Sequence, residues 1–184
     1  MLSLVDCPRL SSQRLTLRRP NRDDAESIRR LADDWEVARR LARVPFPYTL
    51  DDGLFFLDQI VPKEPTWIVQ HASSGDVLGV AGLTPHADAG NMELGYWLGR
   101  EFWGRGFATE AANVVLEHAF GAGLASEITA GCFADNIRSA RVLAKLGFRI
   151  AGESLRLCLA EERELRHYDL LLTRESYLGW KPDF

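Results

Sequence analysis

The sequence predicts a single-domain α/β protein whose mixed, mostly antiparallel sheet of about seven strands contains one parallel crossover and is flanked by helices. Three observations support this. The 184 residues, 46% hydrophobic and 26% charged, suit one core and contain no repeat or linker-like segment. The apolar periodicity is mostly helical in the first third and changes to two after Pro65. A strand, a long helix and a strand then follow over 91–133, which requires a parallel pair. We therefore expect 1–184 to be one domain with a core at about 12–174.

The first third of the chain is expected to contain one strand and then helices. Alternating apolar and polar residues indicate the strand, and capping residues and prolines mark where the elements begin and end. The expected elements are a strand at 14–19 ended by Pro20, a helix capped by Asn21 or Asp23, a helical stretch at about 34–43, and a helix capped by Thr49 with Pro62 beyond it.

The rest of the chain reads as strands with two helices. Short connections at 73–76 and 85–90 make the first three strands an antiparallel meander, and glycines at 121, 123 and 147 close the helices. The expected elements are strands at 66–71, 77–84 and 91–98, a helix at 105–120, a strand at 127–133, a helix at 136–146, and an antiparallel pair at 148–159 and 165–173.

Composition limits the partners. The net charge of −4 and the pI near 5.6 argue against a protein that neutralises nucleic-acid backbones. No apolar run approaches the ~18 residues of a membrane span, and the N-terminus does not resemble a signal peptide. Three cysteines without C-x-x-C spacing fit a reducing compartment. We expect a cytoplasmic protein without nucleic-acid or membrane partners.

A glycine-rich turn precedes the long helix. Gly104 and Gly106 can adopt positive φ, so successive N–H groups and the helix N-terminus can converge on an anion such as a pyrophosphate. A P-loop is excluded because no Lys-[Ser/Thr] pair follows Gly106, and Thr109 stands where a dinucleotide fingerprint needs its third glycine. An ordinary glycine-rich connection remains the alternative.

A second segment, 135–148, follows the strand at 127–133. The Asn136 amide is expected at the mouth of the same cleft, where it can bond amide groups of a ligand, although Asp135 or Asn136 can also simply cap the helix. Ser139 lies one turn further, on roughly the same side.

Three segments together carry a family resemblance: MELGYWL at 92–98, WGRGFATEA at 103–111, and 136–148 with its terminal KLGF. The chain resembles the GCN5-related N-acetyltransferase (GNAT) superfamily, particularly its ribosomal-protein-alanine N-acetyltransferase-like subgroup. The resemblance implies the GNAT fold with splayed central strands, acetyl-CoA as co-substrate, no metal, and direct attack by a primary amine in a ternary complex. It also makes a homodimer plausible.

The resemblance assigns the cofactor contacts. The strand before the turn would pair with the pantetheine arm, the turn and helix start would hold the pyrophosphate, and a backbone N–H of Gly95 or Tyr96 would polarise the thioester, with the glycine permitting a bulge. The cofactor residues are Tyr96, Trp97, Leu98, Trp103, Gly104, Arg105, Gly106, Phe107, Ala108, Thr109, Asn136 and Arg141, with Lys145 as an alternative to Arg141.

Two residues are the catalytic candidates. Glu93 is the first choice of base because it precedes the thioester position, with a solvated strand residue as the alternative reading and His86 or His71 as other bases. For the general acid, many relatives have a tyrosine where this chain has Leu143. Ser139 instead matches the serine of the subgroup. Some protein N-acetylating relatives have a glutamate where this chain has Gly131, so that base does not carry over.

The acceptor is expected to lie against the first helices and the last hairpin. Its contacts would come from Trp35, Phe46, Tyr48 and His86 and from 163–168, while Asp33, Asp34, Asp51 and Asp52 either attract a cationic amine or belong to solvated, charged helix ends. A protein or peptide N-terminal amine is favoured over a polyamine, amino acid or aminoglycoside. A non-catalytic acyl-CoA-binding module and a dinucleotide-dependent oxidoreductase are the other hypotheses. The tail at 177–180 packs at an interface or on its own core.

Overall fold

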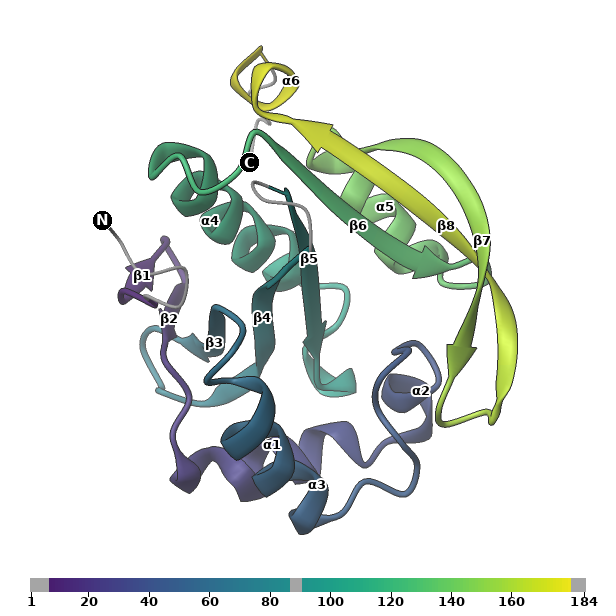
Figure 1. Ribbon diagram of the computed structural model, residues 1–184. Coiled ribbons are helices and arrows are strands. Elements are labelled where there is room, and N and C mark those ends of the chain that lie inside the picture. The colour runs from purple at the N-terminus through teal and green to yellow at the C-terminus, as the bar shows by residue number, and fades with distance from the viewer. Residues whose placement is uncertain (1–6, 87–90, 180–184) are drawn as a thin grey trace.

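The computed structural model describes residues 7–86 and 91–179, and within these ranges it confirms the expected fold (Figure 1). The strands form one eight-stranded sheet in the order β1-β2-β3-β4-β5-β6-β8-β7, and the β5–β6 pair is its parallel pair. The strand beyond the expected seven is β1, whose two residues are too short to show a periodicity. The strands are β1 (Leu10–Ser11), β2 (Leu15–Arg18), β3 (Thr66–His71), β4 (Val77–Pro85), β5 (Asn91–Leu98), β6 (Glu127–Phe133), β7 (Arg149–Cys158) and β8 (Arg163–Thr173).

The helices lie close to their expected positions with two exceptions. The stretch expected at 34–43 is helical only over α2 (Trp35–Ala38), because the next bonds run from Arg40 N–H to Val37 O and from Leu41 N–H to Ala38 O and tighten the chain into turns. A last helix, α6 (Arg174–Gly179), was not expected. The other helices are α1 (Ala25–Ala32) after the short η1 (Arg22–Asp24), α3 (Leu50–Phe55) continued by η2 (Phe56–Ile60), η3 (Arg100–Phe102), α4 (Phe107–Gly121) and α5 (Ile137–Lys145). Residues 87–90 of the expected turn at 85–90 lie outside the described residues.

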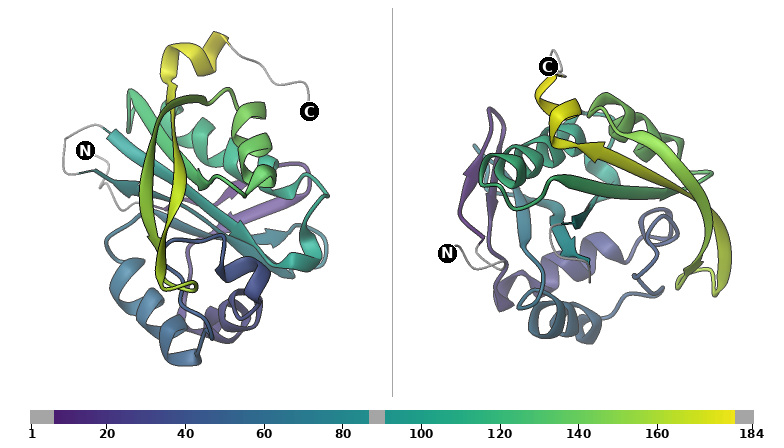
Figure 2. Two further views of the ribbon diagram at one scale, coloured as in Figure 1. Left: turned by 90° about the vertical axis from the view of Figure 1, so that its right-hand side faces the viewer. Right: turned by 45° about the horizontal axis from the view of Figure 1, so that its top comes forward.

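The sheet separates two layers of helices, with α4 and α5 on one face and α1 to α3 on the other (Figure 2). The apolar face of α4, including Phe107, Leu116 and Phe120, packs on the sheet in the larger core. Ile28 of α1 packs with Ile68 of β3 in the smaller core on the opposite face. Burying each of these side chains contributes roughly 1.5–3 kcal/mol to folding. This packing fixes the start of α4 beside the end of β5.

The central strands separate part of the way along the sheet, as expected. β5 pairs with β6 only from Asn91 opposite Glu127 to Leu94 opposite Ala130. Beyond that point β5 stays paired with β4, and β6 stays paired with β8 as far as Phe133 opposite His167. The two halves of the sheet therefore diverge between β5 and β6, which is visible in Figure 1.

The C-terminal helix packs on the protein's own core. The Tyr177 ring lies 5.1 Å from that of Phe120, centroid to centroid, and its hydroxyl donates to Asn113 Oδ1 at 3.0 Å. Trp180, also part of the tail discussed above, lies outside the described residues. Among the helices that the structure describes, none is long and apolar enough to cross a membrane.

Candidate active site

The end of β5 has an unpaired backbone edge. Gly99 N–H donates to Leu78 O, and Asn91 O accepts from His86 N–H, so the odd-numbered residues of β5 direct their backbone groups toward β4. Because alternate residues of a strand point these groups to opposite sides, the even-numbered residues face β6. β6 has already diverged beyond Leu94. The N–H and C=O of Tyr96 and the N–H of Leu98 therefore face the separation between the strands.

Gly95 does not form the expected bulge. The β4–β5 register runs without a shift from Gly79 opposite Leu98 to Pro85 opposite Met92. The glycine is exposed in mid-strand, and a Cβ there would meet nothing within 4 Å. Since the Gly95 backbone faces β4, Tyr96 is the one of the two candidates whose N–H points toward the separation. The space above Gly95 is open to a ligand.

The turn before α4 has the backbone geometry of an anion site. Gly104 and Gly106 have φ of +73° and +81°, and Gly106 is the N-cap of α4 without any side-chain cap bond. The first intrahelical bond is from Glu110 N–H to Gly106 O, so the N–H groups of residues 107–109 have no partner within the helix. These donors and the helix dipole favour a negatively charged group.

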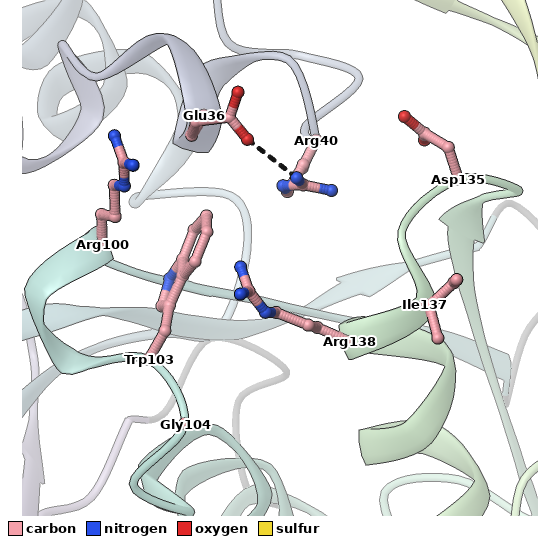
Figure 3. Close-up of a pocket in the computed structure, with 8 residues that line it drawn as sticks. All are labelled: Glu36, Arg40, Arg100, Trp103, Gly104, Asp135, Ile137 and Arg138. Carbon is pink, nitrogen blue, oxygen red and sulfur yellow. Dashed lines mark hydrogen bonds and ion pairs between the residues drawn. The ribbon is translucent and has the colours of Figure 1, made fainter.

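A pocket of about 620 Å³ opens beside this turn (Figure 3). Two guanidinium groups lie over the Trp103 ring, that of Arg40 at 5.6 Å and that of Arg138 at 5.1 Å from its centroid, and Trp103 Nε1 donates to Leu98 O at 2.8 Å. Arg40 is paired with Glu36 and Arg100 lies 3.9 Å from Asp34, so Arg138 is a cation available beside the aromatic ring for an anionic, partly apolar ligand. The pocket is lined by Glu36, Arg40, Arg100, Trp103, Gly104, Asp135, Ile137 and Arg138.

Other predicted cofactor residues surround the same turn. Arg105 stacks on the Phe107 ring at 4.8 Å, and Arg14, which the sequence did not single out, stacks on it at 4.6 Å. Phe107 and Thr109 are buried at the start of α4, next to half-buried Ala108. The turn is thus held rigidly from inside, while its glycines face outward.

Asn136 and Ser139 lie at the start of α5. Asn136 is the N-cap, and its Oδ1 accepts from Ser139 N–H at 3.2 Å, so the capping role is present and the amide NH₂ is left for a ligand. The Ser139 and Tyr96 hydroxyl oxygens are 2.9 Å apart. Burial raises the pKa of Tyr96 well above 10, so this hydroxyl stays protonated and can donate. Arg141 is exposed further along α5. The Tyr96 side chain is a part of the site that the sequence did not reveal.

Glu93 lies on the opposite face of the sheet, where four charged or titratable side chains form a cluster. Its Oε1 accepts from Arg156 Nη1 at 3.0 Å, and Arg156 Nη2 is 3.6 Å from Asp169 Oδ1. Asp169 Oδ1 is in turn 3.0 Å from His167 Nδ1. The Glu93 carboxylate is therefore already engaged by an arginine, which weakens the case for it as the base.

The predicted acceptor residues fall into two groups. Trp35 and Phe46, each 41% exposed, form an edge-to-face pair with centroids 5.3 Å apart, and His86 Nε2 lies 2.9 Å from Thr129 Oγ1. Tyr48 is 6% exposed and packs in the smaller core, so it supports the loop before Thr49 from inside. His71 packs on Phe107, at the cofactor turn rather than near Glu93.

The acids near the first helices are used locally. Asp34 Oδ1 accepts from Glu36 N–H and caps α2, and Asp52 and Thr49 form a capping box at α3. Asp33 Oδ1 accepts from Tyr48 N–H at 2.9 Å. These contacts favour the helix-end interpretation of Asp34 and Asp52, whereas Asp33 holds the loop before Thr49. In the two described ranges, no group of three or more His, Cys, Asp or Glu could hold a metal ion.

His167 lies within 163–168, the segment predicted to contact the acceptor, but the sequence did not single it out. It and Asp169 are two residues apart on β8 and therefore on one face. Gly131 lies opposite Asp169 on β6. The His-x-Asp pattern on a strand is a signal that the sequence contains. That it faces a glycine depends on the pairing of β8 with β6, which the sequence alone did not reveal.

Comparison with known proteins agrees with this geometry. The protein-family model of the acetyltransferase (GNAT) domain matches residues 14–149 of the chain. The uncharacterized N-acetyltransferase p20 of Bacillus licheniformis is 26% identical over 175 residues, covering 92% of this chain and 98% of that protein. A GNAT-family acetyltransferase from Bacillus anthracis superposes with a TM-score of 0.81 at 21% identity, over 91% of this chain and 99% of that one. The ribosomal-protein-S5-alanine acetyltransferase from Vibrio fischeri superposes with a TM-score of 0.77 at 21% identity, over 95% and 100%.

The matched domain spans both diverging strands, the glycine turn and α5, which form the donor side of the site. The expected resemblance is thus confirmed, and with it acetyl-CoA as the donor. The chain belongs to the GNAT family and is an acetyl-CoA-dependent N-acetyltransferase.

Proposed function

We propose that this enzyme acetylates the N-terminal amine of a protein or peptide, by direct attack on the thioester in a ternary complex. The choice of acceptor rests on the pairing of carboxylates around the acceptor face, by which we mean the face of the sheet with Glu93 and the neighbouring Trp35 and Phe46. Glu36 is paired with Arg40 at 2.8 Å, Glu64 with Arg43 at 3.0 Å, and Asp135 with Arg39 at 2.9 Å. Glu93 is paired with Arg156. A face whose acids are neutralised suits a singly charged amine on a neutral backbone better than a polyamine, which needs several unpaired carboxylates.

The surface around this face also favours a peptide. The exposed Trp35 and Phe46 rings offer an apolar contact beyond the reacting amine. Arg156 of the edge strand β7 points to the same face as Glu93, which it contacts at 3.0 Å, whereas Leu155 and Leu157 alternate with it and point to the other face. We propose that the chain following the N-terminal residue lies along the Trp35 and Phe46 rings, with His86 near the amine.

On the donor side, we propose that the pantetheine arm pairs with the free edge of β5 as an added strand. Tyr96 and Leu98 offer the backbone groups, with Trp97 between them, and the Asn136 amide bonds the same arm. The pyrophosphate lies on the turn and the start of α4, with Arg141 near the phosphates. The proposed turn residues are Trp103, Gly104, Arg105, Gly106, Phe107, Ala108 and Thr109.

The proposed roles of the residues follow the movement of charge. Acetyl-CoA supplies the acetyl group as a thioester: the amine nitrogen bonds the carbonyl carbon, the C–S bond breaks, and the sulfur leaves as a thiolate. Tyr96 N–H stabilises the negative charge that develops on the carbonyl oxygen. Ser139, held by the Tyr96 hydroxyl, hydrogen-bonds the thiolate. Glu93, held by Arg156 at 3.0 Å, lines the face from which the amine attacks.

Thiol release from acetyl-CoA across a panel of amines tests this proposal. We expect turnover with short peptides that have a free N-terminus. We expect none with the same peptides blocked at the N-terminus but carrying a lysine, and little with spermidine or free amino acids. Turnover confined to small amines would overturn the peptide acceptor. Acetyl-CoA binding without thiol release from any amine would favour the non-catalytic module instead.

A further inference from the structure

We propose that the imidazole of His167 accepts the proton of the attacking amine, and that Asp169 and Arg156 are its positioning residues. This inference rests on the proposed amine acetylation and names the residue that acts as base in it. Glu93 lies on the same face, paired with Arg156. The argument uses the place of the ring, its orientation and its charged neighbours.

The ring lies where the sheet opens. His167 is on β8, and its Cε1 occupies the place that a Cβ on Gly131 would take. Gly131 is the first residue of β6 beyond Ala130, the last residue paired with β5. The absence of a side chain at 131 therefore brings the imidazole to the point at which β5 and β6 diverge, on the same face as Glu93.

The ring is fixed in orientation. Its Nδ1 is 3.0 Å from Asp169 Oδ1, and its plane meets Phe133 edge-on at 5.7 Å and 81°. It is only 5% exposed. No residue within 7–86 or 91–179 forms a hydrogen bond with Nε2. In the neutral ring, Nδ1–H donates to Asp169 and the lone pair of Nε2 remains available for a proton.

The surroundings keep this ring uncharged. Burial lowers the pKa of His167 below 6.5, and Arg156 on β7 lowers it further, while Asp169 on its own strand and Glu93 on β5 partly oppose this. From β7, Ser154 faces it with an uncharged hydroxyl, and from β6, Phe133 faces it with an apolar ring. His167 is therefore neutral at pH 7 and able to accept a proton, whereas the Glu93 carboxylate is held by Arg156.

The transfer balances in protons and electrons. The amine lone pair forms the C–N bond while the N–H proton passes to Nε2 of His167. The resulting imidazolium is stabilised by Asp169, and the electron pair of the C–S bond leaves with the sulfur. The proton on His167 returns to solvent after the product leaves. The reaction needs no oxidant, reductant or further co-reactant.

The pH dependence of kcat/KM in His167→Gln tests the inference, measured on the best amine of the panel. In the wild type, the His167 imidazole and the amine must both be neutral. Log kcat/KM should therefore rise with pH with a slope of two below both pKa values, and with a slope of one between the pKa of His167 and that of the amine. The peptide amine has a pKa of about 7.7–8.0. In His167→Gln, we expect kcat/KM to fall about 10²–10⁴-fold and the slope to stay at one.

Two neighbouring variants check the positioning roles. Arg156→Gln should move the acid limb of the pH profile of kcat/KM to higher pH, because the cation that lowers the pKa of His167 is gone. Asp169→Asn should move it to lower pH, because a carboxylate that raises that pKa is gone. A merely structural role for these residues would not shift the limb in opposite directions.

Controls separate the possible failures. His118→Gln, on α4 beside Trp67, should keep both slopes, and unchanged acetyl-CoA affinity should show that His167→Gln is folded. A folded His167→Gln enzyme with full turnover or a retained slope of two would overturn the role of His167 alone. A wild type that acetylates no amine in the panel would overturn the proposed function and this inference together.

Discussion

An enzyme carrying Gly104→Val is expected to bind acetyl-CoA about 10–100-fold more weakly than the wild type. Gly104 has φ of +73°, a conformation that a β-branched residue adopts only at a cost of about 1–2 kcal/mol or more. We expect the turn to relax and to move its N–H groups away from the pyrophosphate. Each charge-assisted hydrogen bond lost costs about 1.5–3 kcal/mol, and 1.4 kcal/mol is a factor of ten in affinity. Isothermal titration with acetyl-CoA measures the change.

The chain contains a matched control for this substitution. Gly123 follows α4 at its other end, has φ of +67°, and, like Gly104, has nothing within 4 Å of an added Cβ. Gly123→Val should lose a similar amount of stability but bind acetyl-CoA normally. Equal affinity of the two variants would show that the turn at Gly104 does not hold the cofactor.

Gly131→Ala is expected to lower kcat by about 10²–10⁴-fold while leaving acetyl-CoA affinity nearly unchanged. The added methyl group would meet the His167 ring and the backbone oxygen of Tyr168, so the imidazole must move away from the point of divergence. Such overpacking typically costs 1–3 kcal/mol of stability. Steady-state turnover on the best peptide, with urea unfolding as a check of the fold, measures both effects.

Gly152→Ala is the control for that substitution. Gly152 lies on β7 opposite the same Asp169, but an added Cβ there meets nothing within 4 Å. It should retain wild-type turnover. A stable Gly131→Ala enzyme with wild-type kcat would mean that the position of the His167 ring is unimportant for catalysis.

The donor side of the site could be predicted from the sequence because its residues are close together along the chain. Gly104 to Thr109 form one turn and helix start, and Asn136 and Ser139 form another, so local rules of capping and backbone conformation place them. The divergence of β5 and β6 was implied by the family resemblance. The pairing register of β5 was not, and this register decides which backbone groups of β5 are free.

The acceptor side could not be predicted in the same way. Glu93, Arg156 and His167 come from three strands, and only the sheet order β5-β6-β8-β7 brings them to one face. The same limit applies to Tyr96, whose hydroxyl meets Ser139 of α5. For Asp34 and Asp52 the sequence left open the attraction of an amine or a charged helix end, and the structure shows both residues capping helices.

Amide hydrogen exchange on β5, resolved by residue, tests the central claim that acetyl-CoA lies between the diverging strands. With saturating acetyl-CoA, we predict strong new protection of the amides of Tyr96 and Leu98 and of residues 107–109. The amides of Gly95 and Trp97, which face β4, should change little. Protection that spares Tyr96 and Leu98 while acetyl-CoA is bound would contradict this account of the site.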